Sequence, residues 1–159
     1  MNYLVTGCSR GVGLEICRVL LEQGHTVYGI ARGFSNEFQQ LQEQNQEHLF
    51  FKSIDLSDSE NVRKSIFKDF ISNKLRLDGF VNNAAMAYDD IITNLNLEKL
   101  KAMYAVNVFT PMMITKYAIR KLAVATVSLA IGSVVAVPAI VDSGQVAHAE
   151  EQGGVAAEK

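Results

Sequence analysis

The sequence predicts an α/β protein whose core is a doubly wound parallel sheet. Residues 1–121 alternate short apolar runs with helical patterns, and this alternation occurs four times. Each unit takes about 30 residues, the length of a strand, a crossover helix and their connections in a parallel sheet. A glycine-rich loop joins the first apolar run to the first helical pattern, which is typical of such folds.

The first two strands are expected to flank a helix. Residues 3–5 form an apolar run that predicts the first strand, and residues 25–31 predict the second. Residues 11–22 lie between them and have apolar side chains at helical spacing. We expect this stripe to face the sheet, and its members are Val12, Ile16, Val19 and Leu20.

The next two units follow the same order of strand and helix. Residues 36–46 are rich in glutamine, so we expect a surface helix that buries only Phe38 and Leu41. Residues 49–54 predict the third strand, and residues 77–81 predict the fourth.

Two further helices are predicted from capping signals. Ser57 and Glu60 have the spacing of a capping box. The helix after them is expected to bury Val62, Ile66 and Phe70. Asn96 predicts the N-cap of a long helix over residues 97–121.

The composition excludes several classes of protein. Of the 159 residues, 48% are apolar, which excludes wholesale disorder. The 15 basic and 17 acidic residues give a net charge of −2, so no basic face for nucleic acid is expected. Two cysteines cannot form a disulfide scaffold and favour a reducing compartment. The three histidines are too scattered for a metal motif.

Charge divides the chain into three parts. Residues 1–121 carry 14 basic and 13 acidic side chains, whereas residues 122–141 carry none and residues 142–159 are acidic. The uncharged run has 20 residues, enough to span a bilayer. We therefore predict a domain at 1–121, an apolar segment at 122–141 and an acidic tail at 142–159.

The loop after the first strand predicts a phosphate site. It reads Thr6-Gly7-Cys8-Ser9-Arg10-Gly11-Val12-Gly13 and opens the first helix. Backbone N–H groups at a helix N-terminus bind phosphate, and glycines let the phosphate come close. We therefore expect a dinucleotide to bind here.

The same loop resembles that of the short-chain dehydrogenase/reductase family, and three later segments match the family in order. Asp55-Leu56 ends the third strand, where the family places an aspartate beside the adenine. Asn82-Asn83-Ala84-Ala85 ends the fourth and resembles the family's Asn-Asn-Ala-Gly, with alanine replacing the final glycine. Asn107 resembles the asparagine of the catalytic tetrad.

This resemblance implies a Rossmann-like fold. It also implies the activity of an NAD(P)-dependent oxidoreductase, which transfers hydride between the cofactor and a carbonyl or hydroxyl group. The resemblance covers residues 1–121, so we expect a truncated form of the sheet. The implied cofactor residues are Thr6, Gly7, Ser9, Arg10, Gly11, Val12, Gly13, Arg32, Asp55, Leu56, Asn82, Asn83 and Ala84.

Two arginines favour NADP(H) over NAD(H). NAD-specific sites usually carry an acid at the end of the second strand, and the ribose 2′-phosphate of NADP requires cations instead. Here the strand ends in Ala31-Arg32, and Arg10 lies in the glycine loop. In the family, this pair of basic positions suggests NADP(H). The alternative is that Arg32 is a solvated loop charge.

The family's catalytic tyrosine and lysine are not found where they are needed. Tyr117 and Lys121 have the Tyr-x-x-x-Lys spacing, but they share a helix with Asn107, whereas the family places its pair on the next helix. Ser133 lies about where the family's serine falls, yet no tyrosine follows it. We therefore expect no reductase turnover from this chain alone. Pro111 cannot donate to the Asn107 carbonyl, which predicts a kink or a free carbonyl.

Residues 117–151 resemble a YSIRK-type signal peptide of Gram-positive surface proteins. Lys116, Arg120 and Lys121 form a positive region before the apolar run, and Ala147-His148-Ala149 is similar to a cleavage site. A chimera of a reductase front half and a leader is therefore our preferred interpretation. The alternative is that residues 124–137 form a degenerate fifth strand.

Three functions of different classes follow from these patterns. The first is an oxidoreductase-family protein that binds NADP(H) without its own catalytic pair. The second is a non-catalytic partner that forms a homo-oligomer or joins a complete reductase through the helix over 97–121. The third is a membrane-tethered or exported segment, with membrane contact through 122–141 and the nucleotide domain in the cytoplasm.

Overall fold

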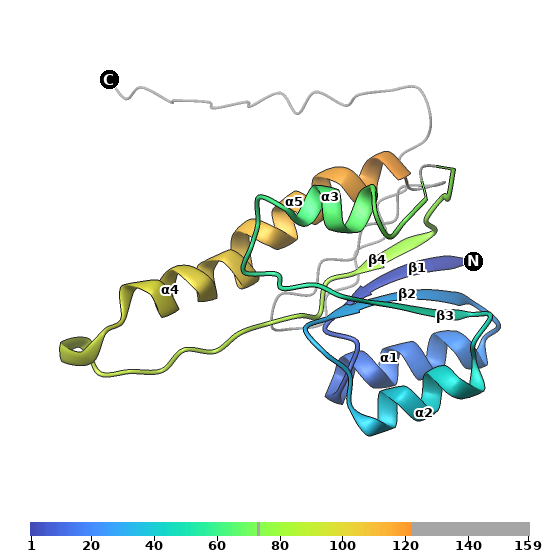
Figure 1. Cartoon of the computed structure of the whole chain (residues 1–159), viewed down its shortest axis with the longest axis horizontal. Coiled ribbons are helices and arrows are strands. Elements are labelled where there is room, and N and C mark those ends of the chain that lie inside the picture. The colour runs from blue at the N-terminus through green and yellow to red at the C-terminus, as the bar shows by residue number, and fades with distance from the viewer. Residues whose placement is uncertain (73, 122–159) are drawn as a thin grey trace, which may run out of the picture.

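Four parallel strands form the centre of the structure, a computed structural model that describes residues 1–72 and 74–121. Their order is β3-β2-β1-β4, which confirms the predicted parallel α/β sheet (Figure 1). The strands are β1 (Asn2–Thr6), β2 (Thr26–Ala31), β3 (Leu49–Ser53) and β4 (Gly79–Val81). Because every pair is parallel, the carboxyl ends of all four strands lie at one edge of the sheet.

Two helices cover one face of the sheet. They are α1 (Gly11–Glu22) and α2 (Asn36–Gln44), and Figure 1 shows both on the same side of the strands. Phe38 and Leu41 of α2 are buried, as expected, against Val5 and Val27 of the sheet.

The predicted buried stripe of α1 is wrong in part. Val12 and Val19 are exposed, whereas the helix buries Gly13, Leu14, Cys17 and Leu21. Gly13 allows the start of α1 to lie close to the loop after β1, since a Cβ there would overlap the Gly7 carbonyl. The helix is therefore rotated about its axis, and the stripe of larger side chains does not face the sheet. Ile16 and Leu20 are partly buried at the edge of the contact.

Both cysteines lie in this close contact and are fully buried. A Cβ on Gly29 of β2 would lie 2.7 Å from the Cys8 sulfur, so the loop rests directly on the strand. A hydrogen bond with the Cys17 side chain and burial raise the pKa of the Cys8 thiol. The Cys8 thiol therefore stays neutral, and both cysteines act as small packing groups.

The other face is covered by α3 (Val62–Phe67) and α5 (Thr110–Ala118), which lie side by side in Figure 1. Ile66 and Ile114 are fully buried against Leu4 and Ile30 of the sheet. The capping-box prediction is wrong, because α3 starts at Val62 and its N-cap Asn61 makes no side-chain hydrogen bond. Ser57 instead donates to Asp55.

The long helix predicted over 97–121 is present but changes type along its length. Its segments are α4 (Leu97–Tyr104), the π-helix η2 (Ala105–Phe109), α5 and the 3₁₀ turn η3 (Ile119–Lys121). Asn96 caps it by accepting a hydrogen bond from the Lys99 N–H at 3.0 Å, as predicted. The π-helix ends two residues before Pro111, whose missing N–H interrupts the α-helical hydrogen bonding there. A short 3₁₀ turn, η1 (Ile92–Asn94), precedes α4.

The apolar segment at 122–141 and the acidic tail at 142–159 lie outside the described residues. Within 1–72 and 74–121, no helix combines the length and the apolar content that crossing a membrane requires.

Candidate dinucleotide site

A cavity of about 630 Å³ opens at the carboxyl edge of the sheet. Loops after all four strands line it, and two residues of the long helix, Ala102 and Val106, complete the wall. Of the residues predicted for the cofactor, the lining contains Gly7, Ser9, Arg10, Arg32, Asp55, Leu56, Asn83 and Ala84. The remaining five do not line the cavity: Thr6 ends β1, Gly11, Val12 and Gly13 open α1, and Asn82 follows β4.

Glycine is required at three positions of the first loop. Gly7 and Gly11 have φ values of 67° and 56°, a left-handed conformation that other residues adopt only with strain. Gly13 has an ordinary φ, but a Cβ there would overlap the Gly7 carbonyl and the Asn83 amide. The N-cap residue Arg10 is extended, and its side chain does not cap α1. The first N–H groups of the helix are thus left for a ligand.

Thr6 joins the end of β1 to the end of β4. Its hydroxyl donates to Asn82 Oδ1 at 3.2 Å and accepts from the N–H groups of Asn83 and Ala84, each at 3.1 Å. Asn83 Nδ2 in turn donates to the carbonyls of Thr6 and Gly7. These bonds fix the glycine loop against the segment after β4, so the two walls of the cavity are held together.

Two cations stand at the opening of the cavity. Arg10 and Arg32 are both exposed, and neither takes part in a salt bridge among the described residues. Ser35 supports this wall, because its hydroxyl donates to the Ser9 carbonyl at 2.7 Å and accepts from the N–H of Phe38. An anionic group that enters here meets two guanidinium groups.

Asp55 lies two residues after the end of β3 and is held as a carboxylate. Its Oδ1 accepts from the N–H and the hydroxyl of Ser57, each at 2.9 Å. These hydrogen bonds, with the nearby Arg32 charge as a smaller cause, hold the pKa of Asp55 below its usual value. Its neighbour Leu56 is buried, and the Leu56 carbonyl accepts from the Thr110 hydroxyl at 2.7 Å.

Asn107 lies in the π-helix η2 and is bonded to the loop after β4. Its side chain accepts from the Met86 N–H and donates to the Met86 carbonyl, each at 2.8 Å. Met86 lines the cavity but Asn107 does not, so Asn107 positions the part of the wall that Met86 forms. Sequence reasoning missed Met86 and the role of Ser35 and Ser57. The Asp55–Ser57 spacing was the one available signal, since aspartate often bonds two residues ahead.

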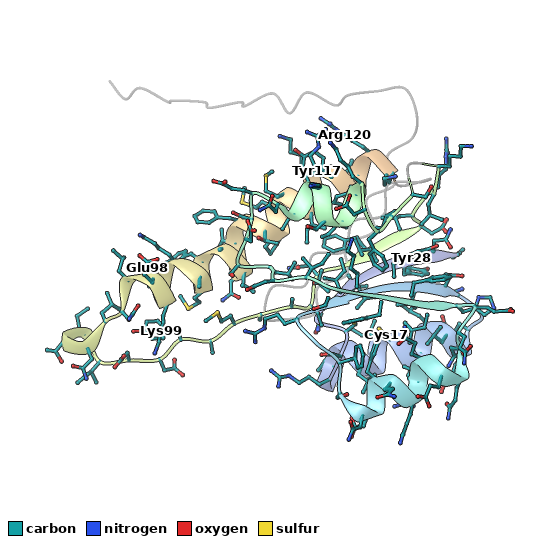
Figure 2. All side chains as sticks on the ribbon, viewed as in Figure 1. Cys17, Tyr28, Glu98, Lys99, Tyr117 and Arg120 are labelled. Atoms are coloured by element: carbon teal, nitrogen blue, oxygen red, sulfur yellow. The ribbon has the colours of Figure 1, made fainter. Side chains whose placement is uncertain are left out.

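Tyr117 does not line the cavity. Figure 2 shows Tyr117 near the end of α5, close to Arg120 of η3, and the Tyr117 ring packs on Phe67 of α3 at 5.8 Å between centroids. Lys121 donates to the Ser72 carbonyl. This pair thus serves the packing of the helices. Ser133 lies outside the described residues. Among those described, no three His, Cys, Asp or Glu side chains gather as a metal site.

A parallel sheet with a glycine loop and a helix N-terminus at its carboxyl edge defines an α/β dinucleotide-binding fold of the Rossmann type. A family model described as "short chain dehydrogenase" matches residues 2–149. The chain therefore belongs to the short-chain dehydrogenase family. Proteins of this family bind nicotinamide dinucleotides.

Curated relatives support this membership. The chain is 33% identical to a benzil reductase ((S)-benzoin forming) of Bacillus cereus, an alignment that covers 72% of this chain and 48% of that protein. It is 29% identical to an L-xylulose reductase of Caenorhabditis elegans, with 74% and 46% covered. The chain thus spans about half the length of the curated relatives that it matches.

Solved structures share the fold. A short-chain dehydrogenase from Streptomyces avermitilis is 26% identical, with a TM-score of 0.66 over 75% of this chain and 43% of that one. A carbonyl reductase from Pseudomonas aeruginosa has a TM-score of 0.68 at 22% identity, over 80% of this chain and 60% of that one. The family match extends across 122–141, and the signal-peptide interpretation of that segment stays a prediction.

Proposed function

We propose that residues 1–121 form the dinucleotide-binding part of a short-chain oxidoreductase and bind NADP(H) in preference to NAD(H). The observation that carries this proposal is the cavity at the carboxyl edge, where Gly7, Asp55 and Asn83 meet the two arginines. Exposed N–H groups at the start of α1 suit the pyrophosphate. When bound, NADPH supplies the hydride.

The preference for NADP(H) rests on charge. The 2′-phosphate distinguishes the two cofactors, and a guanidinium binds a phosphate with two parallel hydrogen bonds. Arg32 follows the second strand, where an acid would repel that phosphate. Arg10 supplies a second cation from the glycine loop.

We further propose that these 159 residues bind the cofactor without reducing a substrate. Asn107 is tied to Met86, and Tyr117 lies outside the cavity lining. The wall that the described residues form contains no tyrosine, lysine or histidine that could serve as the general acid. Steady-state assays with NADPH and carbonyl substrates such as benzil are expected to show no turnover above the blank.

Thermal unfolding with and without cofactor tests the binding proposal. A ligand at 100 times its dissociation constant adds about 2.7 kcal/mol of stability. We expect NADPH to raise the Tm and NADH to raise it less at equal concentration. Arg32→Ala should narrow the difference between the NADPH and NADH shifts, with Arg10 left as the remaining cation. The control Arg18→Ala, on α1 and away from the cavity lining, should keep the difference. Equal shifts for both cofactors in the unaltered chain would refute the preference, and no shift with either would refute the binding.

A second copy of the chain is the partner that the long helix favours. Tyr104, Val108, Phe109 and Met112 are between 40% and 67% exposed on η2 and the adjoining ends of α4 and α5. Apolar side chains grouped in this way mark a protein interface. Light scattering should show a dimer that Met112→Asp dissociates; a monomer at all concentrations would contradict this.

We also propose that the nucleotide domain lies in the cytoplasm and that 122–141 contacts the membrane.

A further inference from the structure

The two helical layers of the molecule differ in charge. Residues 61–77 and 110–121, which include α3 and α5, carry eight basic side chains and one acidic side chain, Asp69. Residues 11–47, which include α1 and α2, carry two basic and five acidic side chains. The layers cover opposite faces of the sheet (Figure 1), so basic side chains outnumber acidic ones in the α3 and α5 layer, which the net charge of the chain did not lead us to expect.

The basic layer has a centre at Tyr117. Three cations lie close to its ring: the distances to the centroid are 5.3 Å for Arg63 Cζ, 5.7 Å for Lys116 Nζ and 5.8 Å for Arg120 Cζ. All three side chains are exposed, and none is in a salt bridge among residues 1–72 and 74–121. Arg63 comes from α3 and the other two come from the end of α5 and η3, so packing of two helices creates the cluster.

This cation cluster of Arg63, Lys116 and Arg120 has no role in the nucleotide site. None of its members lines the cavity, and the ring of Tyr117 packs on Phe67 of α3. Three like charges around one ring repel one another, and the ring faces offset only part of that repulsion. An external anionic surface would offset the rest.

We propose that the cation cluster docks the protein on a membrane surface of anionic phospholipid. Basic side chains next to an apolar segment bind anionic headgroups, each adding to the affinity. The described chain ends at η3, and a run of 20 uncharged residues begins at the next position. The cluster therefore lies where the chain passes into its most apolar segment. This placement favours a lipid surface over a nucleic acid or a soluble polyanion.

Vesicle sedimentation of the full 159-residue chain tests the proposal. Vesicles of phosphatidylcholine are compared with vesicles of phosphatidylcholine and phosphatidylglycerol in equal parts, at low and at physiological salt. We expect much tighter binding to the anionic vesicles, and weaker binding as salt rises. The triple variant Arg63→Gln, Lys116→Gln, Arg120→Gln should lower the partition coefficient by about 100-fold, since each cation contributes about fivefold.

The matched control removes three cations from elsewhere, with Arg18→Gln, Lys52→Gln and Lys99→Gln. It changes net charge equally, and its binding to anionic vesicles should stay within a few-fold of that of the unaltered chain. If both triple variants lose vesicle binding equally, the proposal is overturned. It is also overturned if the unaltered chain binds neutral and anionic vesicles equally, because membrane contact would then belong to 122–141 alone. If millimolar inorganic phosphate releases all the protein from the vesicles, the ligand of the cluster is a soluble anion and not a membrane. If the protein binds an RNA oligonucleotide but no vesicles, the ligand is a nucleic acid. If the cluster variant does not fold, the salt dependence of the unaltered chain decides, because salt-independent binding excludes the cations.

Discussion

Replacing Thr6 by valine will remove the hydroxyl that joins the ends of β1 and β4. The side chain is fully buried and takes part in three hydrogen bonds, with Asn82 Oδ1 and with the N–H groups of Asn83 and Ala84. Valine has the same shape, so the change leaves the packing and deletes only the polar atom. At about 1 kcal/mol for each bond, we expect a loss of about 3 kcal/mol in the free energy of unfolding.

Thr6→Ser is the matched control, because it keeps the hydroxyl and deletes a methyl group. Loss of one buried methyl group costs about 1 kcal/mol. Urea unfolding followed by circular dichroism gives both free energies by linear extrapolation. Valine should therefore be the more destabilising substitution by about 2 kcal/mol. If Thr6→Val is as stable as Thr6→Ser, the hydroxyl network does not join the strands and the reasoning fails.

Three other predictions follow from the same loops. Gly13→Ala should destabilise the protein by about 2 kcal/mol through overlap with the Gly7 carbonyl and the Asn83 amide. The control Gly24→Ala should cost only about 1 kcal/mol, because φ is 75° there but the space around it is open. Equal free energies of unfolding in urea would contradict the overlap. Ser57→Ala should raise the pKa of Asp55 toward its ordinary value, measured by NMR titration of the carboxyl group. Because the pKa of Asp55 is lowered in the folded state, the stability from this carboxylate is present above about pH 4 and is lost as the pH falls through the folded value. The unaltered chain should therefore lose its stability advantage over Ser57→Ala on acidification. An advantage that does not depend on pH would have another cause. Asn107→Ala should speed hydrogen exchange at the Met86 amide, which loses its acceptor, and Asn107→Asp should speed it less because an acceptor remains; unchanged exchange in both would show that the bond is not formed in solution.

The order and type of the elements could be predicted from the sequence because apolar periodicity and turn residues act locally. The strands lie within two residues of their predicted ends, and α1 has the predicted bounds. The buried face of α1 could not be predicted. Helical periodicity favours larger side chains such as Val12 and Val19 for the buried face. The close approach of α1 to the loop after β1 instead buries Gly13 and Cys17.

The chemistry of the candidate site was only partly predictable. The spacing of the glycines predicted a phosphate loop at the carboxyl edge of the sheet. Such a loop needs free backbone N–H groups and residues with a positive φ, and both requirements favour glycine. The bonds between Asn107 and Met86 span 21 residues, and no local pattern indicates such a pair. The capping box at Ser57 was a wrong interpretation because the aspartate two residues earlier competes for the same serine.

The two hydrophobic cores differ in how much of the chain each one needs. The core under α1 and α2 is built almost entirely from residues 5–51, whereas the core under α3 and α5 extends from Leu4 to Ala118. Register pairs Leu4 with Tyr28 on one side and with Phe80 on the other, so the second pairing closes a loop about three times longer. That difference costs about 1 kcal/mol of loop-closure entropy. We therefore expect the first three strands to assemble early as a folding nucleus, with β4 and the long helix added afterwards, an order that also matches synthesis from the N-terminus.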